Sequence, residues 1–421
     1  MPRSAIRGVA RGVAASSPRR WAVSVAAIGL CACGEPTSPP APGGPTATAS
    51  APAVPFSAPP GTAAQRTGRA GAAGQRVEVP AGSFTAGSTP GDEGRHPTFE
   101  PPRVAFTLGA FGIARLPYPN DPSLPPRTGV TRDEAAKLCA ARSGRLCTDL
   151  EWERACQGPD GDRYAGGEQW SPECGLDPAR CASGFDVLAM GGGLREWTSS
   201  EVPRIKGVVK RDAPVIKGAG PGARDVDHRC ARRDVAAADT SAPDLGFRCC
   251  FGEAPDVVIA APDWEPTMTR IDFPPTRLAD LFRADPKLAP LAAGEIKYFN
   301  EAAARATVLR RAAARGATEA WPEGTETTTA PVVWNPAPGE TILLVTGVSG
   351  DDSFIVAYHR APDGNHRLGA AMLMENELGP VVFVYDKYRR RQLQWTTCLD
   401  CYGDTGNITY REENRVAITQ R

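Results

Sequence analysis

The chain has few histidines, no net charge and no apolar run long enough to cross a bilayer. Lys plus Arg total 48 and Asp plus Glu total 48, so the formal net charge is zero and the composition gives no case for a nucleic-acid partner. The four histidines fall two in each of the folded regions described below, which leaves no histidine triad for iron in the sequence. The apolar run Ala22–Ala32 is too short to span a bilayer as a helix.

What the N-terminus does have is the pattern of an exported lipoprotein. Arginines precede the apolar run, and the run ends in Leu30-Cys31-Ala32-Cys33, which resembles a bacterial lipobox. That motif implies a signal peptide over residues 1–32, cleavage before Cys33, and acylation of Cys33, which would anchor the protein to a membrane. An ordinary signal peptide ending in cysteines is the alternative. Gly34 stands where Asp often retains lipoproteins at the inner membrane, so we expect the outer membrane of a bacterial cell envelope, on its periplasmic face or the cell surface.

Residues 33–76 are rich in Pro, Ala, Gly, Thr and Ser and have hardly a large apolar side chain, which predicts a disordered tether.

Export implies an oxidising compartment, in which cysteines form disulfides. Of the 12 cysteines, ten follow Cys33, eight in one region and two in another. These even numbers predict up to five disulfides, none of which crosses between domains. The ten are Cys139, Cys147, Cys156, Cys174, Cys181, Cys230, Cys249, Cys250, Cys398 and Cys401.

Residues 77–252 are predicted to form a loop-rich first domain with few regular elements. A strand is expected over Val104–Phe111 and a helix over Thr131–Arg142, where Thr131 and the glutamate three residues later form a capping box. A shorter helix is expected over Asp149–Cys156, with Thr148 as its N-cap.

Residues 253–338 are predicted to be a linker followed by a helical bridge, whose arginines read as a solvated helix face. Residues 339–421 alternate in strand fashion between turn signals, which predicts a small antiparallel β domain of roughly six strands.

Cys398 and Cys401 stand before a turn rather than a helix, which favours a structural disulfide over a redox motif. The chain has no second CxxC, so a four-cysteine zinc site is excluded.

Several sequence blocks of the first domain resemble those of the formylglycine-generating enzymes, also called sulfatase-modifying factors, and occur in that family's order. They are VEVPAGSF at Val77–Phe84, TLGAFGI at Thr107–Ile113, GRLCTDLEWERAC at Gly144–Cys156, REWT at Arg195–Thr198 and DLGFRC at Asp244–Cys249. The resemblance implies an α+β fold, a variant of the C-type-lectin-like fold with little regular structure.

The resemblance also implies particular disulfides. The family's two bridges correspond to Cys139–Cys249 and Cys156–Cys230. Cys147 and Cys250 are additions to the family pattern that would neighbour the first pair, so we predict that they bond to each other. Cys174 and Cys181 are left to pair locally. Permuted connectivities remain the alternative, because eight cysteines can pair in many ways.

The family's chemistry depends on two further cysteines, which bind copper(I) and oxidise a substrate cysteine to formylglycine. The corresponding segment of this chain, Gly218–Arg229, contains no cysteine and is shorter. Asp225 stands roughly where the second reactive cysteine would be. A carboxylate neither holds copper(I) as a thiolate does nor forms a mixed disulfide with a substrate. We therefore expect formylglycine generation, and copper with it, to be lost.

The sequence offers two other candidate metal sites. Asp225, Asp227 and His228 could form a cluster of hard ligands, although surface charges beside a disulfide are the simpler interpretation. The family's calcium site uses the Asn and Glu of a Gly-Asn-Val-x-Glu-Trp motif. Here Glu196 is retained, but Gly193 replaces the Asn, so one calcium ligand is lost.

The sequence therefore predicts a membrane-anchored, non-catalytic binding or scaffold module, with no cofactor expected beyond calcium as an open alternative. Its partner would be a protein, peptide or glycan bound in the groove that admits substrate in the family, with the β-rich domain as a second interaction surface. The competing hypothesis is a metal-dependent oxidase or sulfatase-modifying enzyme of the same family with altered active-site ligands, drawn from Asp225, Asp227, His228 and Glu196.

Overall fold

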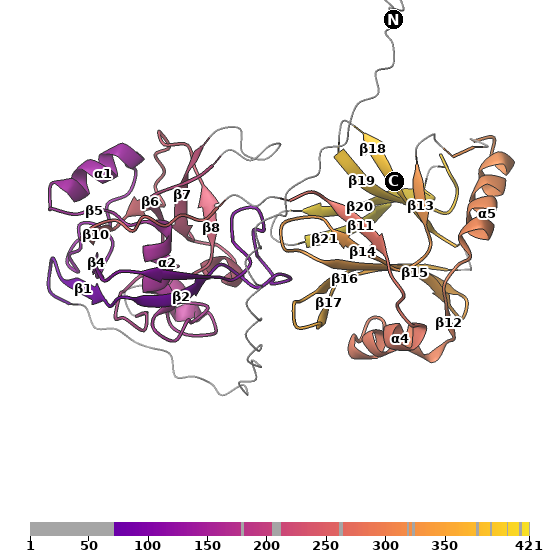
Figure 1. Ribbon diagram of the computed structural model, residues 1–421, viewed down its shortest axis with the longest axis horizontal. Coiled ribbons are helices and arrows are strands. Elements are labelled where there is room, and N and C mark those ends of the chain that lie inside the picture. Colours follow the sequence, from indigo (N-terminus) through magenta and orange to yellow (C-terminus); the bar gives the residue numbers. More distant parts are fainter. Residues whose placement is uncertain are drawn as a thin grey trace, which may run out of the picture. The chain divides into compact units, whose positions relative to one another are not determined.

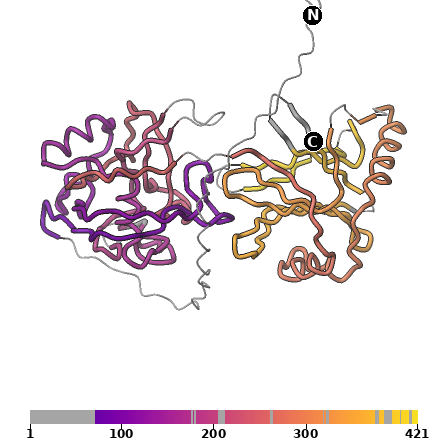
Figure 2. Tube along the Cα trace, in the orientation of Figure 1, coloured from indigo at the N-terminus to yellow at the C-terminus, as the bar shows by residue number. Residues whose placement is uncertain are grey.

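The computed structural model describes residues 71–177, 181–203, 212–260, 264–317, 320–321, 325–375, 379–387, 390–401, 403–411 and 415–420, and Figure 2 draws the remainder in grey. The predicted signal peptide, Cys33 and most of the predicted tether lie outside these described residues. Within them, none of the helices combines the length and apolar character that crossing a membrane requires.

The first folded part contains short strands arranged in small sheets (Figure 1). One sheet has the order β1-β4-β10-β5, and a second has the order β8-β7-β6-β9, in which β6 and β9 are parallel. The hairpin β2-β3 stands beside them. The bounds are Arg76–Val79 for β1, Gly82–Ala86 for β2, Val104–Leu108 for β3, Phe111–Ala114 for β4, Arg145–Leu146 for β5, Arg195–Val202 for β6, Ala213–Gly218 for β7, Arg233–Val235 for β8, Leu245–Phe247 for β9 and Cys249–Phe251 for β10.

The two helices predicted in this part are confirmed, capping included. Helix α1 spans Arg132–Ala140, and the Thr131 hydroxyl and the Glu134 carboxylate form a capping box. Helix α2 spans Asp149–Gln157 and has the same device, built from Thr148 and Glu151. Every residue of α2 is buried, so this helix runs through the centre of the domain rather than along its surface. The predicted strand Val104–Phe111 is instead divided into β3 and β4.

Two short helical elements complete this part of the chain, α3 over Pro172–Leu176 and the 3-10 turn η2 over Asp225–His228. Its main core surrounds Trp152 of α2, whose side chain is 1% exposed. Strand residues, α2 and two of the disulfides contribute to that core, in which Val79, Leu108, Ile113, Leu150, Cys156, Met190 and Cys230 are buried.

The second folded part contains two antiparallel sheets that enclose a common core. One sheet has the order β11-β14-β15-β16-β17, with β12 also paired to β15, and the other has the order β13-β18-β19-β20-β21. Side chains from both sheets meet in one buried cluster that includes Leu344, Ile355, Val382 and Trp395. Figure 1 shows the strands in orange to yellow. The bounds are Thr267–Arg270 for β11, Ile296–Lys297 for β12, Glu326–Thr328 for β13, Val332–Asn335 for β14, Ile342–Ser349 for β15, Asp352–Arg360 for β16, His366–Glu375 for β17, Val381–Lys387 for β18, Arg390–Thr396 for β19, Thr405–Arg411 for β20 and Arg415–Gln420 for β21.

Helices cover the outer faces of both sheets. Helix α4, Pro275–Ala284, packs on the first sheet through Leu278 and Phe282, and the 3-10 turn η3, Ala289–Ala293, packs on it through Leu291. Helix α5, Glu301–Ala314, packs on the second sheet through Ala304 and Val308. The two sheets and their helices thus form four layers, helix on sheet on sheet on helix, and we refer to this unit as the sandwich.

The stretch that the sequence analysis assigns to a linker and bridge has a larger role in the structure. Strands β11 to β14 come from residues 253–338 and pair either with one another or with strands β15 and β18 of the predicted β domain. The predicted helical bridge is also interrupted, because β12 lies between η3 and α5. These strands have two to four residues each, too few for their alternation to be recognised without the partner strands.

Candidate functional site

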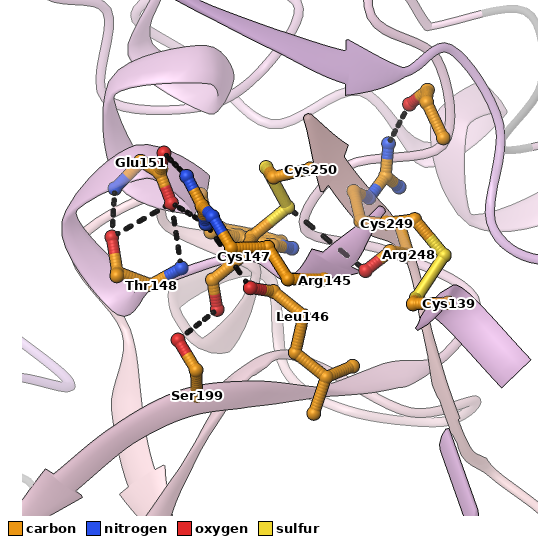
Figure 3. The surroundings of a disulfide bond; sticks show 12 residues. Cys139, Arg145, Leu146, Cys147, Thr148, Glu151, Ser199, Arg248, Cys249 and Cys250 are labelled. Carbon is orange, nitrogen blue, oxygen red and sulfur yellow. Dashed lines mark hydrogen bonds and ion pairs between the residues drawn. A yellow bond between two sulfur atoms is a disulfide. The ribbon is translucent and has the colours of Figure 1, made fainter. Parts of the chain in front are cut away.

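Disulfides hold the framework around the site. The structure pairs Cys139 with Cys249, Cys147 with Cys250, Cys156 with Cys230, Cys174 with Cys181 and Cys398 with Cys401. These are the pairs that the sequence analysis sets out, including the one added to the family pattern. Adjacent residues of β10 form the first two bonds, which tie that strand to α1 and to Cys147 in the turn between β5 and α2 (Figure 3).

The GRLCTDLEWERAC segment is fixed by contacts at its start. Arg145 forms an ion pair with Glu151 at 2.6 Å, and the Glu151 carboxylate also accepts the backbone N–H of Thr148 at 2.9 Å (Figure 3). Ser199 of β6 donates its hydroxyl and its backbone N–H to the carbonyl oxygen of Cys147. The turn before α2 is therefore held from three sides, which fixes the direction of the helix.

Buried ion pairs surround α2. Lys217 on β7 donates to Glu153 at 2.9 Å, and both side chains are at most 1% exposed. Burial raises the pKa of Glu153 even though the Lys217 charge opposes that shift. Arg233 on β8 pairs with Asp149 at 2.7 Å in an equally buried position. These charges are neutralised by one another, and each pair connects α2 to the second sheet.

By its resemblance to the formylglycine-generating enzymes, the segment between β7 and Cys230 corresponds to the one that carries their reactive cysteines. It leaves β7 at Gly218, turns at Pro221-Gly222 and enters η2. It contains no thiol, and every cysteine in the described residues is bonded in a disulfide. The residues of this site therefore do not fit copper(I), which requires thiolate ligands in this chemistry.

Asp225, Asp227 and His228 lie together on η2, but the structure does not combine them as metal ligands. The Asp227 carboxylate accepts from Arg224 at 2.9 Å and from Arg232 at 2.8 Å. The His228 ring stacks on Trp170 at 3.8 Å, and its Nδ1 lies 2.8 Å from the carbonyl oxygen of Gly191. Among the described residues, the only trio of candidate ligands close enough to share an ion is Cys398, Cys401 and Asp404, whose two cysteines are bonded to each other.

Glu196 is likewise committed to a structural role. Its carboxylate accepts two hydrogen bonds from Arg248, at 2.6 and 2.7 Å, and one from Nε1 of Trp152 at 2.9 Å. All three side chains are at most 1% exposed. Arg248 supplies the positive charge that a calcium ion would supply to this carboxylate. Glu196 therefore holds the core together, and its surroundings do not fit a calcium ligand.

A second buried network leads away from η2. Arg229 donates to both carboxylate oxygens of Glu100, at 2.8 and 3.1 Å, and Glu100 also accepts from Ser88 at 2.6 Å. The backbone carbonyl of Glu100 accepts from Arg95, which in turn pairs with Glu340 of the sandwich at 2.5 Å. Burial alone would raise the pKa of Glu100, but the charge and hydrogen bonds of Arg229 outweigh it and hold that pKa below its ordinary value.

The Arg95–Glu340 pair is fully buried, with both side chains 0% exposed. Glu340 also accepts the backbone N–H of Gly91 at 3.0 Å, and Arg367 on β17 donates to the Gly91 carbonyl at 2.6 Å. The loop between β2 and β3 is therefore bonded to the sandwich by its backbone and by a buried charge. The β-rich part contributes to the surroundings of the candidate site.

A cleft of about 620 Å³ lies beside these contacts, and we refer to it as the composite cleft. That volume is suited to a small organic ligand or to a few side chains of a larger one. The cleft is lined by Thr89, Pro90, Gly91, Asp92, Glu93, Arg163, Tyr164, Glu168, Gln169, Trp170, Asp225 and Val226 from the first part of the chain, and by His359, Ala361, Asn365, His366 and Arg367 from β16, β17 and their connection.

Sequence reasoning found Asp225 but missed the rest of the cleft and the Glu100 network. The two residues of the Arg95–Glu340 pair are 245 positions apart, and no local pattern connects them. In the sequence, His359 is only one of four histidines, but in the structure its side chain is 1% exposed and lies in a strand. A histidine that directly follows the apolar run Phe354–Tyr358 is the sequence signal that points to it.

Comparison with known proteins identifies the first part of the chain. A family model described as sulfatase-modifying factor enzyme 1-like domain matches residues 115–251. Among solved structures, PvdO from Pseudomonas aeruginosa is 20% identical, with 42% of this chain and 93% of that chain covered and a TM-score of 0.34. CarF is 18% identical, with 42% of this chain and 97% of that chain covered and a TM-score of 0.33. Treponema denticola variable protein 1 is 14% identical, with 42% of this chain and 94% of that chain covered and a TM-score of 0.32. A search of curated proteins gives no match.

The match covers the helix pair, the second sheet and the three longest-range disulfides described above. Residues 115–251 thus form a sulfatase-modifying factor enzyme 1-like domain, a formylglycine-generating-enzyme-like domain as the sequence blocks indicate.

Proposed function

We propose that this protein is a non-catalytic binding module of the bacterial cell envelope. The observation that carries the proposal is the lack of a free thiol in the described residues, combined with a segment Gly218–Arg229 that contains no cysteine. Without a thiolate there is no ligand for copper(I) and no nucleophile to capture a substrate cysteine. What the domain retains is a rigid framework beside an accessible cleft.

The framework suits a binding role. In this proposal the domain is a variant of the C-type-lectin-like fold, in which loops between few regular elements present the ligand site. Disulfides and buried ion pairs fix those loops in advance, which lowers the conformational entropy lost on binding. The composite cleft would then receive a ligand, and the sandwich would supply part of its wall.

Three of the four ligand candidates of the competing enzyme hypothesis are engaged in other contacts, which supports the binding proposal. Asp227 is paired with two arginines, His228 is bonded to Gly191 and stacked on Trp170, and Glu196 is held by Arg248. A metal ion bound to Glu196 would have to displace Arg248 from a buried ion pair, which costs several kcal/mol. We therefore favour binding over metal-dependent oxidation.

An oxidation assay tests the proposal. A sulfatase-derived peptide with a reactive cysteine, incubated with copper(I)-treated protein and oxygen, should yield no aldehyde, whereas a copper-loaded formylglycine-generating enzyme should yield one under the same conditions. Metal analysis of chelator-washed protein should find no stoichiometric copper, iron or calcium. Aldehyde above the level of the protein-free reaction, or one equivalent of bound metal, would refute the non-catalytic reading.

The proposed anchor requires a separate test. We propose that the mature chain begins at Cys33 and is held at the outer membrane by acyl groups on that residue, with the following residues as a tether. Radiolabelled palmitate should label the wild type and the Cys31→Ala variant, and labelling should disappear in Cys33→Ala. Labelling that survives in Cys33→Ala would exclude Cys33 as the anchor.

A further inference from the structure

The composite cleft has an excess of negative charge. Four carboxylates line it, on Asp92, Glu93, Glu168 and Asp225, against two guanidinium groups. One of these, Arg367, donates through both Nε and Nη2 to the carbonyl oxygen of Gly91. The other belongs to Arg163, whose guanidinium lies 5.8 Å from the centre of the Tyr164 ring. The lining as a whole therefore favours a cation.

Aromatic rings form part of the same wall. Tyr164 and Trp170 line the cleft with their ring centres 6.0 Å apart. The ring of His228 stacks on Trp170 with the ring centres 3.8 Å apart. The stack holds Trp170 in place without any contribution from a ligand. Aromatic faces beside carboxylates are the usual surroundings of ammonium and guanidinium groups in proteins.

The sandwich contributes a buried acceptor. His359 on β16 lines the cleft, its side chain is 1% exposed, and neither ring nitrogen has a hydrogen-bond partner. Its Nδ1 is 3.9 Å from the nearest Glu340 oxygen, which is too far for a hydrogen bond. Gly369 on β17 leaves the space that the ring occupies, since a Cβ there would stand 2.9 Å from its Nε2.

His359 is uncharged at neutral pH. Burial, with the nearby positive charge of Arg367, lowers the pKa of His359 to about 3. Burial also lowers the pKa of His366 at the same wall, helped by Arg277 and Arg360. A neutral imidazole has one nitrogen that accepts a hydrogen bond. Because an unpaired buried acceptor is costly, the ring is suited to accept an N–H from a ligand.

We propose that the composite cleft binds an ammonium or guanidinium group, held by the carboxylates and aromatic rings of the first part of the chain and by His359 of the sandwich. The site needs both parts, so it extends beyond the residues that the family model matches. This inference rests on the proposed binding function and gives it a ligand class. The cation could be a small free amine or the side chain of a peptide, because both present the same group.

Calorimetric titration of the purified full chain with agmatine tests the proposal. Wild-type protein should bind agmatine more tightly than 4-guanidinobutyrate, which has no net charge, and should not bind acetate. A blocked Gly-Arg-Gly peptide identifies the source of the cation: binding tighter than that of agmatine points to a peptide, and weaker binding points to a free amine.

Variants then locate the site. Asp225→Asn and Glu168→Gln each should weaken agmatine binding about three- to five-fold, as expected for exposed charge pairs. Asp239→Asn, an exposed aspartate outside the cleft lining, is the matched control and should change nothing. Arg163→Gln should strengthen binding, because it removes a like charge.

The His359→Phe variant, checked for an unchanged melting temperature, should weaken binding about ten-fold, and the carboxylate variants keep the test valid if this one unfolds. The proposal is overturned if agmatine does not bind, if Asp239→Asn weakens binding as much as Asp225→Asn, or if acetate binds and requires Arg163. None of these results would bear on the oxidation assay, so a failed ligand class and a failed binding function can be told apart.

Discussion

Replacing Glu100 by Gln is expected to lower the free energy of unfolding by about 3–5 kcal/mol at neutral pH. The change leaves the Arg229 guanidinium, only 1% exposed, without its carboxylate. It also weakens the hydrogen bonds that Glu100 accepts from Ser88 and from the backbone of His96. Urea denaturation monitored by tryptophan fluorescence measures the loss. Asp280→Asn, which breaks the exposed pair with Arg283, is the control and should cost less than about 0.5 kcal/mol.

The effect of Glu100→Gln should depend on pH in a defined direction. The folded-state pKa of Glu100 lies below its ordinary value of 4.5, because Arg229 and the other donors outweigh burial. Its ionisation therefore adds stability above that ordinary value, and this contribution is lost as the pH falls through the folded-state pKa. The difference between wild type and Glu100→Gln should be full at neutral pH and should shrink in more acidic buffer. A difference that is the same at every pH would show that the effect does not come from the charge.

Removing the two neighbouring disulfides on β10 should cost more than the sum of the single losses. With Cys139–Cys249 intact, Cys147–Cys250 closes a loop of only about ten residues, and its removal should cost about 2–3 kcal/mol. The same holds for Cys139–Cys249 while Cys147–Cys250 is present. When both are removed the chain loses a longer closure, and the total loss should exceed the sum of the two single losses by about 1 kcal/mol.

Paired Cys→Ala substitutions compare these variants, with the Cys398–Cys401 pair as the control because it closes a very short loop, with a sequence separation of 3. The measured quantity is the free energy of unfolding from urea titration under non-reducing conditions. Strict additivity of the two β10 pairs would mean that strain or residual structure in the unfolded state, and not loop closure, sets their contribution. In either case the pair added to the family pattern should stabilise the domain.

Much of this architecture could be predicted from local sequence. Thr131 and Thr148 mark the starts of α1 and α2 because a hydroxyl followed three residues later by a glutamate satisfies the first backbone N–H groups of a helix. The strands from β15 to β21 were expected because each has six to ten residues between turn signals. The disulfide pairs followed from the family resemblance together with the presence of two extra cysteines.

Other features were beyond the reach of local sequence. Strands β11 to β14 are so short that only their partners stabilise them as strands. Asp227 and Glu196 read as ligand candidates because a sequence does not reveal which arginine neutralises a carboxylate. The structure answers that question for both.

Residue identity within short segments was enough to predict that residues 115–251 form a formylglycine-generating-enzyme-like domain, and it shows directly that the segment Gly218–Arg229 contains no cysteine. The relation between Asp225 and His359, in contrast, is visible only in the folded chain. They are far apart in the chain, yet they line one cleft, and their chemistry depends on burial and on neighbouring charges. Burial and charge are properties of packed surfaces, and packing brings together residues that no sequence pattern relates.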